Sequence, residues 1–108
     1  MEEKDINRMM LHYEQLYKTS NRECINPEIE ALSIDDLKPI VNMVSKSRAD
    51  YLKFTYELGK KYGEGHTEIS ADELKKLKVL RLRFTELSEA SIAFETSIQR
   101  GYLDLKID

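Results

Sequence analysis

Residues 63–84, GEGHTEISADELKKLKVLRLRF, decide the fold because they hold both a reversal of the chain and the start of a long periodic segment. Gly63 and Gly65 allow the backbone to turn, and Gly63 is expected to end the preceding helix in the left-handed conformation. Ser70 and Glu73 form an S-x-x-E capping box, in which each side chain satisfies a backbone N–H at the helix start. The run VLRLRF alternates like a strand, but it lies within about thirty residues of helical period without a breaker. The sequence therefore predicts a turn followed by a helix.

This helix, predicted over residues 71–100, carries a seam of side chains at alternating steps of three and four residues, which is typical of knobs-into-holes packing. The seam consists of Leu77, Leu80, Phe84, Leu87, Ser91, Phe94 and Ile98. Val79 and Leu82 fall outside it. Gly101 allows the helix to stop, and we expect residues 103–108 to form a flexible tail.

The segment before the turn is predicted to be a second long helix, residues 36–62. Proline is tolerated in the first turn of a helix, so Pro39 places the N-cap at Asp36 and not at Ser33. Apolar residues at heptad-like spacing form the expected core face: Leu37, Ile40, Val41, Val44, Tyr51, Phe54, Leu58 and Tyr62. Two long helices joined by a short loop run antiparallel, so the sequence predicts a helical hairpin.

A shorter helix is predicted over residues 3–20, because apolar side chains recur there on one face of a 3.6-residue period. These are Ile6, Met9, Met10, Tyr13, Leu16 and Tyr17. Asn26 and Pro27 suggest an N-cap and a first-turn proline, which predict a further short helix at 27–32. The expected fold is all-α and a single domain over residues 1–108. It is a long antiparallel hairpin with the shorter N-terminal helix packed across it, a three-helix bundle with a coiled-coil-like core.

Composition excludes several classes of protein. A chain of 108 residues with 41% hydrophobic and 34% charged residues suits one domain of amphipathic helices. The formal charge of −3 gives no overall attraction to nucleic acid or to anionic lipid. No apolar run is long enough to span a membrane, and the first residues lack a secretory signal. A single cysteine, Cys24, favours a reducing compartment, so we expect a cytoplasmic protein without a membrane partner.

No pattern indicates catalysis or a bound cofactor. His66 lies between Glu64 and Glu68, but a metal site needs three or four converging ligands. His12 lies beside the apolar stripe of the first helix, with no nucleophile or second histidine near it. Cys24 lies in a polar linker. We therefore expect a non-catalytic protein with no cofactor and no metal.

Basic side chains gather near the turn. Residues 53–83 contain eight Lys and Arg and five Asp and Glu, a net charge of +3, whereas the rest of the chain has a net charge of −6. In a hairpin these basic residues form one basic tip. A solvated surface, an acidic protein partner and nucleic acid are each compatible with it, although the interleaved glutamates weaken phosphate binding.

We expect a protein–protein interaction module of the adaptor, accessory or chaperone-like kind, which associates with itself as a dimer or with an acidic partner. Val79 and Leu82 add an apolar strip that the short first helix does not reach, which favours a partner helix or a second copy. The candidate partner-binding residues are Lys60, Lys61, Lys75, Lys78, Val79, Arg81, Leu82 and Arg83. The alternative is a nucleic-acid-binding accessory protein that uses the same basic tip.

Overall fold

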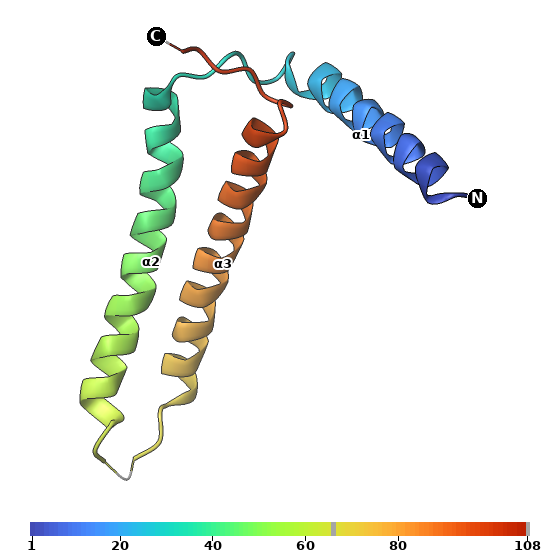
Figure 1. Cartoon of the computed structure of the whole chain (residues 1–108). Coiled ribbons are helices and arrows are strands. Elements are labelled where there is room, and N and C mark those ends of the chain that lie inside the picture. Colours follow the sequence, from blue (N-terminus) through green and yellow to red (C-terminus); the bar gives the residue numbers. More distant parts are fainter. Residues whose placement is uncertain (66, 108) are drawn as a thin grey trace. The chain divides into compact units, whose positions relative to one another are not determined.

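The computed structural model describes residues 1–65 and 67–107, and this part of the chain contains three helices: α1 (Glu3–Ile25), α2 (Ile34–Tyr62) and α3 (Ala71–Gln99) (Figure 1). The only β-type pairing among these residues is an isolated bridge between Leu32 and Leu105. The all-α prediction is confirmed.

The chain divides into two compact units. One consists of Met1–Leu37 with Phe94–Asp108, and the other of Lys38–Ala93. The first unit contains α1 and the C-terminal tail, and the second contains most of α2 and α3. That residues 1–108 fold as a single domain, with the N-terminal helix packed across a hairpin, stays a prediction.

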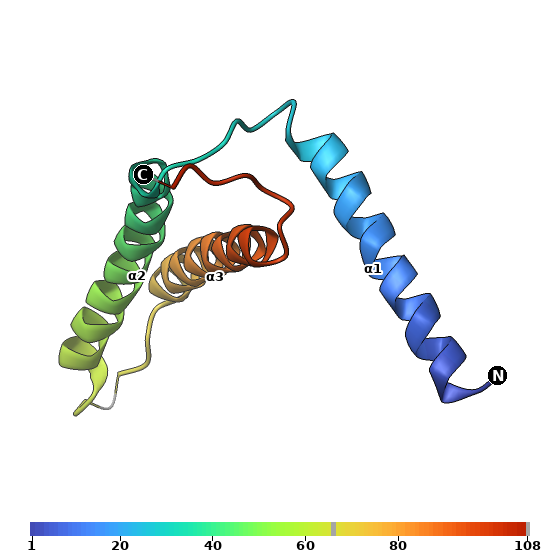
Figure 2. The same cartoon turned by 45° about the horizontal axis from the view of Figure 1, so that its top comes forward.

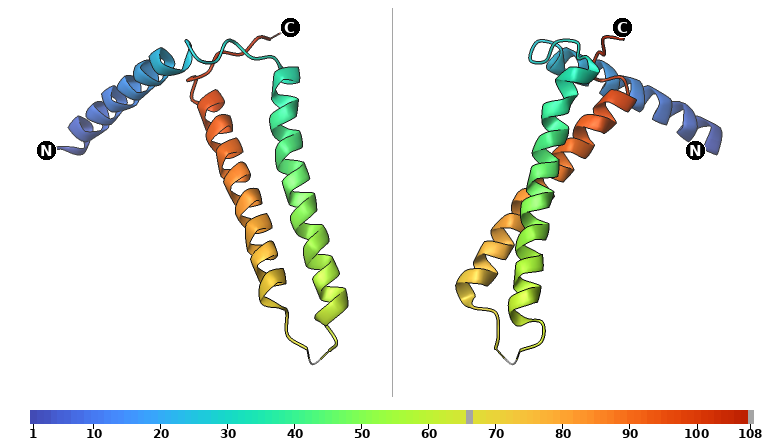
Figure 3. Two further views of the ribbon diagram at one scale, coloured as in Figure 1. Left: turned by 180° about the vertical axis from the view of Figure 1, so that it is seen from behind. Right: turned by 90° about the vertical axis from the view of Figure 1, so that its left-hand side faces the viewer.

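In the unit Lys38–Ala93, α2 and α3 pack together, and they lie side by side in Figure 1 and in the left-hand view of Figure 3. Val44, Ser47 and Leu58 of α2 are buried. The facing side chains of α3 are half-buried, and they include the predicted seam residues Leu77, Leu80, Phe84, Leu87 and Ser91. The regular steps of three and four along both helices keep these faces together, as in a coiled coil.

The residues of α2 and α3 that contact each other occur in opposite sequence order along the two helices. The rings of Tyr51 and Phe84 lie 6.1 Å apart between centroids, and the guanidinium of Arg48 lies 5.1 Å from the Phe84 ring. Nearer the turn, Lys61 of α2 forms an ion pair of 3.2 Å with Glu73 of α3. As the residue number rises in α2 it falls in α3, which is the order that antiparallel packing produces.

One predicted core position of α2 is wrong. Val41 is 58% exposed, whereas Ser47, which the sequence did not suggest, is only 4% exposed. Val41 directly follows Ile40 and is therefore turned about 100° away from the face that Ile40 continues. Ser47 lies on that face at three residues from Val44, and its hydroxyl donates a hydrogen bond of 2.7 Å to the Val44 carbonyl. This bond satisfies the polar group that packing buries.

The start of α2 also differs from the prediction, because the cap is Ser33 and not Asp36. The Ser33 backbone N–H donates to the Asp36 carboxylate at 2.9 Å, and the Asp36 backbone N–H donates to the Ser33 hydroxyl at 3.3 Å. Pro39 therefore lies in the second turn, inside the helix. The two N–H groups satisfied at the cap stabilise the start of the helix, while Pro39 removes one backbone hydrogen bond within it.

The turn after α2 uses its glycines differently from the prediction. Among the described residues only Gly101 has a positive φ, of 74°, so Gly63 is not left-handed. Gly63 is needed for a different reason, since a Cβ there would lie 2.5 Å from the carbonyl oxygen of Gly59.

The predicted capping box of α3 is confirmed: the Glu73 backbone N–H donates to the Ser70 hydroxyl at 3.1 Å, and the Ser70 backbone N–H donates to the Glu73 carboxylate at 3.3 Å. His66, within this turn, lies outside the described residues.

In the other unit, α1 continues past the predicted end at residue 20 as far as Ile25, because no breaker precedes Pro27. The short helix predicted at 27–32 is absent from the structure, where residues 26–29 form a turn and a bend. Leu32 cannot join a helix because the tail uses both of its backbone groups. Its N–H donates to the Asp104 carbonyl at 2.9 Å, and its carbonyl accepts from the Lys106 N–H at 2.7 Å.

The tail is positioned by the end of α3 and by these contacts. The Tyr102 N–H donates to the Ser97 carbonyl at 2.8 Å and the Gly101 N–H to the Ile98 carbonyl at 3.1 Å, the pair of bonds of a Schellman motif with Gly101 as the left-handed residue. Leu103 is 5% exposed. Figure 2 shows the tail running beside the linker between α1 and α2. The flexible tail predicted at 103–108 is thus held by defined contacts up to residue 106, and residue 108 lies outside the described residues.

Candidate functional site: a groove with a basic rim

A groove of about 500 Å³ lies on the α2–α3 pair, close to the start of α3. Tyr51 of α2 lines it together with residues of α3, namely Ala71, Leu74, Lys75, Leu77, Lys78 and Arg81. The uncharged members form an apolar floor, and Lys75, Lys78 and Arg81 form a cationic edge. We call this feature the basic-rimmed groove.

The groove forms because α3 has apolar side chains outside the seam as well as within it. Leu77 belongs to the seam and is half-buried, whereas Leu74, three residues earlier, is 56% exposed beside it. The three cations follow at steps of three, so they line one side of the helix. Their long aliphatic stems extend the apolar surface while their charges stay in water.

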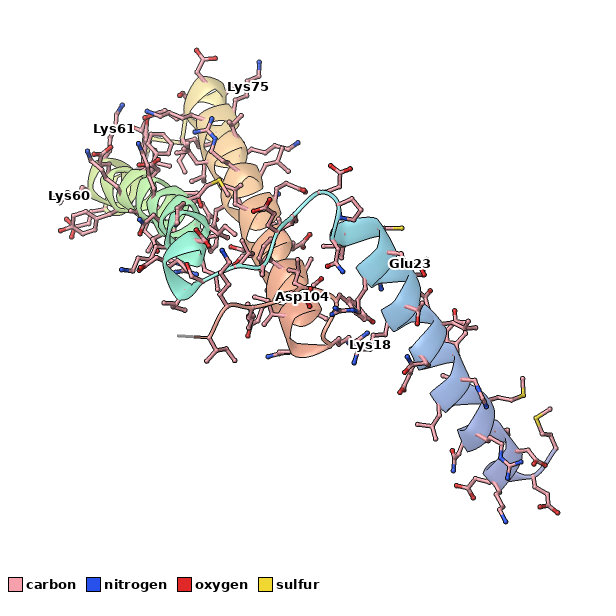
Figure 4. The ribbon with its side chains drawn as sticks, turned by 90° about the horizontal axis from the view of Figure 1, so that it is seen from above. Lys18, Glu23, Lys60, Lys61, Lys75 and Asp104 are labelled. Carbon is pink, nitrogen blue, oxygen red and sulfur yellow. The ribbon has the colours of Figure 1, made fainter. Side chains whose placement is uncertain are left out.

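The groove unites three of the eight predicted partner-binding residues: Lys75, Lys78 and Arg81. The other five lie outside its lining: Lys60, Lys61, Val79, Leu82 and Arg83. All eight are exposed. Figure 4 shows Lys60, Lys61 and Lys75 at the ends of α2 and α3 that the turn joins.

Lys60 and Lys61 already have partners within the chain. The Lys60 ammonium lies 4.6 Å from the centroid of the Tyr56 ring. The Lys61 ammonium forms a hydrogen bond of 3.2 Å with the Glu73 carboxylate, and this bond raises the pKa of Lys61. These two cations are therefore less suited to an outside partner than the cations of the groove.

Glu73 is the centre of a hydrogen-bonded cluster that joins the end of α2 to the start of α3. Its carboxylate accepts hydrogen bonds from the hydroxyls of Tyr62 and Ser70 as well as from Lys61. These donors lower the pKa of Glu73 to about 2, with the Tyr62 hydroxyl as the largest cause. The cluster keeps Glu73 ionised and fixes the helix that carries the groove.

Val79 and Leu82 form a separate exposed strip. They are 52% and 58% exposed, as expected from their positions off the seam. Neither lines the groove, although Val79 directly follows Lys78 and Leu82 directly follows Arg81.

A second apolar surface lies on α1, the helix that the sequence predicts to pack across the hairpin. The six residues of the apolar stripe are 47–68% exposed, and none of α1 is buried: Ile6, Met9, Met10, Tyr13, Leu16 and Tyr17. The rings of Tyr13 and Tyr17 meet edge to face at 5.0 Å between centroids, which gives the stripe a continuous aromatic part.

The charges of α1 are sorted around this stripe. Glu3 and Glu14 precede Ile6 and Tyr17 by three residues, and Asp5 precedes Met9 by four, so acidic groups are neighbours of the stripe. The basic residues lie about 140–180° round the helix axis from the middle of the stripe, so they form the back of the helix. They are Lys4, Arg8, Lys18 and Arg22.

The back of α1 is the side that the tail holds. Arg22 donates a hydrogen bond of 2.9 Å to the Gly101 carbonyl and forms an ion pair of 2.8 Å with Asp104. A Cβ on Gly101 would meet the Lys18 side chain at 3.3 Å, so this lysine lies against the same turn. Lys18 and Asp104 are labelled in Figure 4. The stripe therefore faces away from the contacts that hold α1.

Neither Cys24 nor His12 is among the residues that line the groove. Cys24 is exposed on α1, as is His12. Within residues 1–65 and 67–107, no three His, Cys, Asp or Glu side chains are grouped as a metal site requires. Over the same residues, no helix has the combination of length and apolar character that crossing a bilayer demands.

Comparison of the chain with protein-family models, with curated proteins and with solved structures found no match.

Proposed function

We propose that this protein is a non-catalytic protein–protein interaction module that binds an acidic amphipathic helix in the basic-rimmed groove. The composition of the groove supports this function: an apolar floor formed by two packed helices, with three cations along its edge. An amphipathic helix inserts apolar side chains at positions i, i+3, i+4 and i+7 into such a groove. Acidic groups beside those positions would meet Lys75, Lys78 and Arg81.

The two kinds of contact contribute differently. Apolar burial on Tyr51, Leu74 and Leu77 supplies the affinity, because it removes exposed hydrocarbon from water. The cations favour acidic partners, speed their association and disfavour basic ones. A groove with both features therefore selects the charge of its partner as well as its helical pattern.

The proposal includes a long antiparallel hairpin as the scaffold. The Tyr51–Phe84 and Lys61–Glu73 contacts support it, since both have the order of antiparallel packing. Two helices held along a heptad seam and joined by a capped turn would give the groove a stable shape before a partner binds. A preformed surface loses less conformational entropy on binding.

A pair of labelled designed peptides tests the proposal by fluorescence anisotropy. Both peptides are amphipathic helices with leucines at i, i+3, i+4 and i+7, one with glutamates beside the leucines and the other with lysines. We expect the full chain to bind the glutamate peptide, and Lys78→Glu to weaken binding at least about tenfold, or ~1.4 kcal/mol. Lys53→Glu makes the same charge change outside the groove and should have less than about a threefold effect. Absent binding, or equal effects of the two variants, would refute the groove as the site.

The alternative is a nucleic-acid-binding accessory protein that uses the basic tip, and the exposure of its lysines and arginines favours it. Phosphate contacts respond to total charge and weaken steeply with salt. A labelled DNA or RNA duplex would then lose affinity equally with Lys53→Glu and Lys78→Glu, and would be released by modest added salt. Binding of the glutamate peptide with selective loss in Lys78→Glu would instead favour the protein-binding function.

A further inference from the structure

We infer that the occupant of the basic-rimmed groove is α1 of a second copy of this chain, so that two copies exchange their α1 helices in a closed dimer. The inference rests on the proposed function and adds the identity of the partner. It follows from four properties of α1 and the groove, which concern charge, length, reach and self-repulsion.

The charges of the two surfaces are complementary. The apolar stripe of α1 has Glu3, Asp5 and Glu14 beside it and its basic residues on the back. The groove has an apolar floor with Lys75 and Lys78 on its rim. When the stripe lies on the floor, acidic groups of α1 come next to basic groups of α3, and the basic back of α1 points away.

The lengths also match. The stripe runs from Ile6 to Tyr17, eleven residues apart, or roughly 17 Å along a helix. The groove runs from Ala71 to Arg81, ten residues apart, or roughly 15 Å. One α1 would therefore fill one groove along its whole length.

The α1 of the same chain is too short for this role. Arg22 is held at Gly101 and Asp104, just beyond the end of α3. Ile6 lies sixteen residues from Arg22, roughly 24 Å along α1, whereas Arg81 is already eighteen residues from Gln99, roughly 27 Å along α3. The stripe cannot lie along the groove of its own chain while that contact holds.

Two α1 helices are poor partners for each other. In a pair of α1 helices the acidic residues that flank one stripe would face those of the other, and like charges across such an interface are unfavourable. Glu3 and Glu14 would then approach the equivalent carboxylates of the second copy. The groove offers the stripe opposite charge in place of repulsion.

Each copy has one α1 and one such groove, so a two-fold symmetric exchange uses both and stops at two copies. Sedimentation velocity of the full chain over a concentration series should show a monomer–dimer equilibrium with no larger species. Leu16→Lys, Glu14→Lys and Lys78→Glu should each weaken the dimer at least about tenfold, with circular dichroism showing unchanged helix. Leu52→Lys replaces a leucine of α2 that is 58% exposed, and it should leave the dimer unchanged.

The decisive experiment mixes two variants that fail alone. Glu14→Lys places a positive charge next to Lys78 of the other copy, and Lys78→Glu places a negative charge next to Glu14 of the other copy. Each variant alone therefore brings like charges together. In a heterodimer of the two variants, one contact joins the two substituted side chains, whose charges are reversed but still opposite, and the other is the native pair. Mixing should therefore restore dimerisation to within about threefold of the wild type. Lys53→Glu in place of Lys78→Glu should not restore it.

Each other result overturns the inference in a distinguishable way. A dimer that resists Lys78→Glu but is lost with Leu16→Lys would show α1 pairing with α1. Growth beyond a dimer would refute closed exchange. A chain that stays monomeric but binds the glutamate peptide would refute α1 as the occupant and leave the proposed function standing. A monomer that also fails to bind the peptide would refute both.

Discussion

Truncation of Leu58 to alanine tests the packing on which the groove depends. Leu58 is 6% exposed and lies on the face of α2 that packs against α3. Buried leucines cost about 2–5 kcal/mol when replaced by alanine, because apolar contacts are lost and a cavity remains. We expect about 3 kcal/mol for Leu58→Ala. This loss is a large share of the roughly 5–15 kcal/mol by which a folded domain is usually stable.

Urea unfolding followed by circular dichroism at the helical band measures this loss. With a slope of about 1–3 kcal/mol per molar urea, a loss of about 3 kcal/mol lowers the unfolding midpoint by roughly 1–3 M. The matched control is Leu52→Ala, which removes the same atoms from a side chain of α2 that is 58% exposed, and it should change stability by less than about 0.5 kcal/mol. Both variants are compared at one protein concentration, since self-association adds to apparent stability. Equal losses in the two variants would refute the packing of α2 on α3 through this face.

Four further variants test individual contacts. Ser70→Ala removes the α3 cap and should cost about 1 kcal/mol, lowering the thermal midpoint by several degrees; an unchanged midpoint would contradict the capping box. Because the folded pKa of Glu73 is about 2, below its ordinary 4.5, its stabilisation is complete above pH 4.5 and is lost as the pH falls towards 2. The stability difference between wild type and Glu73→Gln should therefore shrink across that range, and a constant difference would refute the assignment. Ser88→Ala removes a buried hydroxyl that has no partner among the described residues and should stabilise the protein by about 1 kcal/mol, whereas a loss would show that this hydroxyl has a partner in solution. Arg22→Ala should change global stability by less than about 1 kcal/mol, since its ion pair with Asp104 is partly exposed, but should speed amide exchange at the end of α1; unchanged exchange would argue against this anchor.

Features that depend on short sequence spacing could be predicted well. The seam of α3 and the Ser70–Glu73 cap each follow from residues within one or two turns of each other. The cap at Ser33 has the same kind of signal, with Asp36 in the place of the usual glutamate. The prediction of Asp36 follows from the rule that proline is tolerated in the first turn of a helix, whereas this helix accommodates Pro39 in its second turn.

Features that depend on distant residues could not be predicted. Leu32 is extended because the backbone near Leu105 pairs with it, and nothing near Leu32 in the sequence indicates that partner. The helix predicted at 27–32 depends only on two adjacent residues, Asn26 as the N-cap and Pro27 in the first turn. The held tail was likewise missed, because its contacts lie with residues of the linker and of α1.

The candidate site was predicted in part. A count of charges was enough to find Lys75, Lys78 and Arg81, but the groove that they line also needs Tyr51 from α2. The position of Tyr51 relative to α3 depends on the register of the two helices. The stripe of α1 was correctly identified as apolar, but periodicity cannot say whether an apolar face is covered within one chain.

The contact of Arg22 with Gly101 joins residues 79 positions apart, whereas that of Lys61 with Glu73 joins residues only 12 apart. Closing the longer loop costs about 1.7 kcal/mol more chain entropy if both loops are flexible. We therefore expect loop length to set the order in which contacts form during folding. The contact across the α2–α3 turn forms early, and the contact between α1 and the tail forms last. Pulse-labelling of amides during refolding would show this delay as late protection at Leu32 and Lys106, and simultaneous protection in both regions would disprove it.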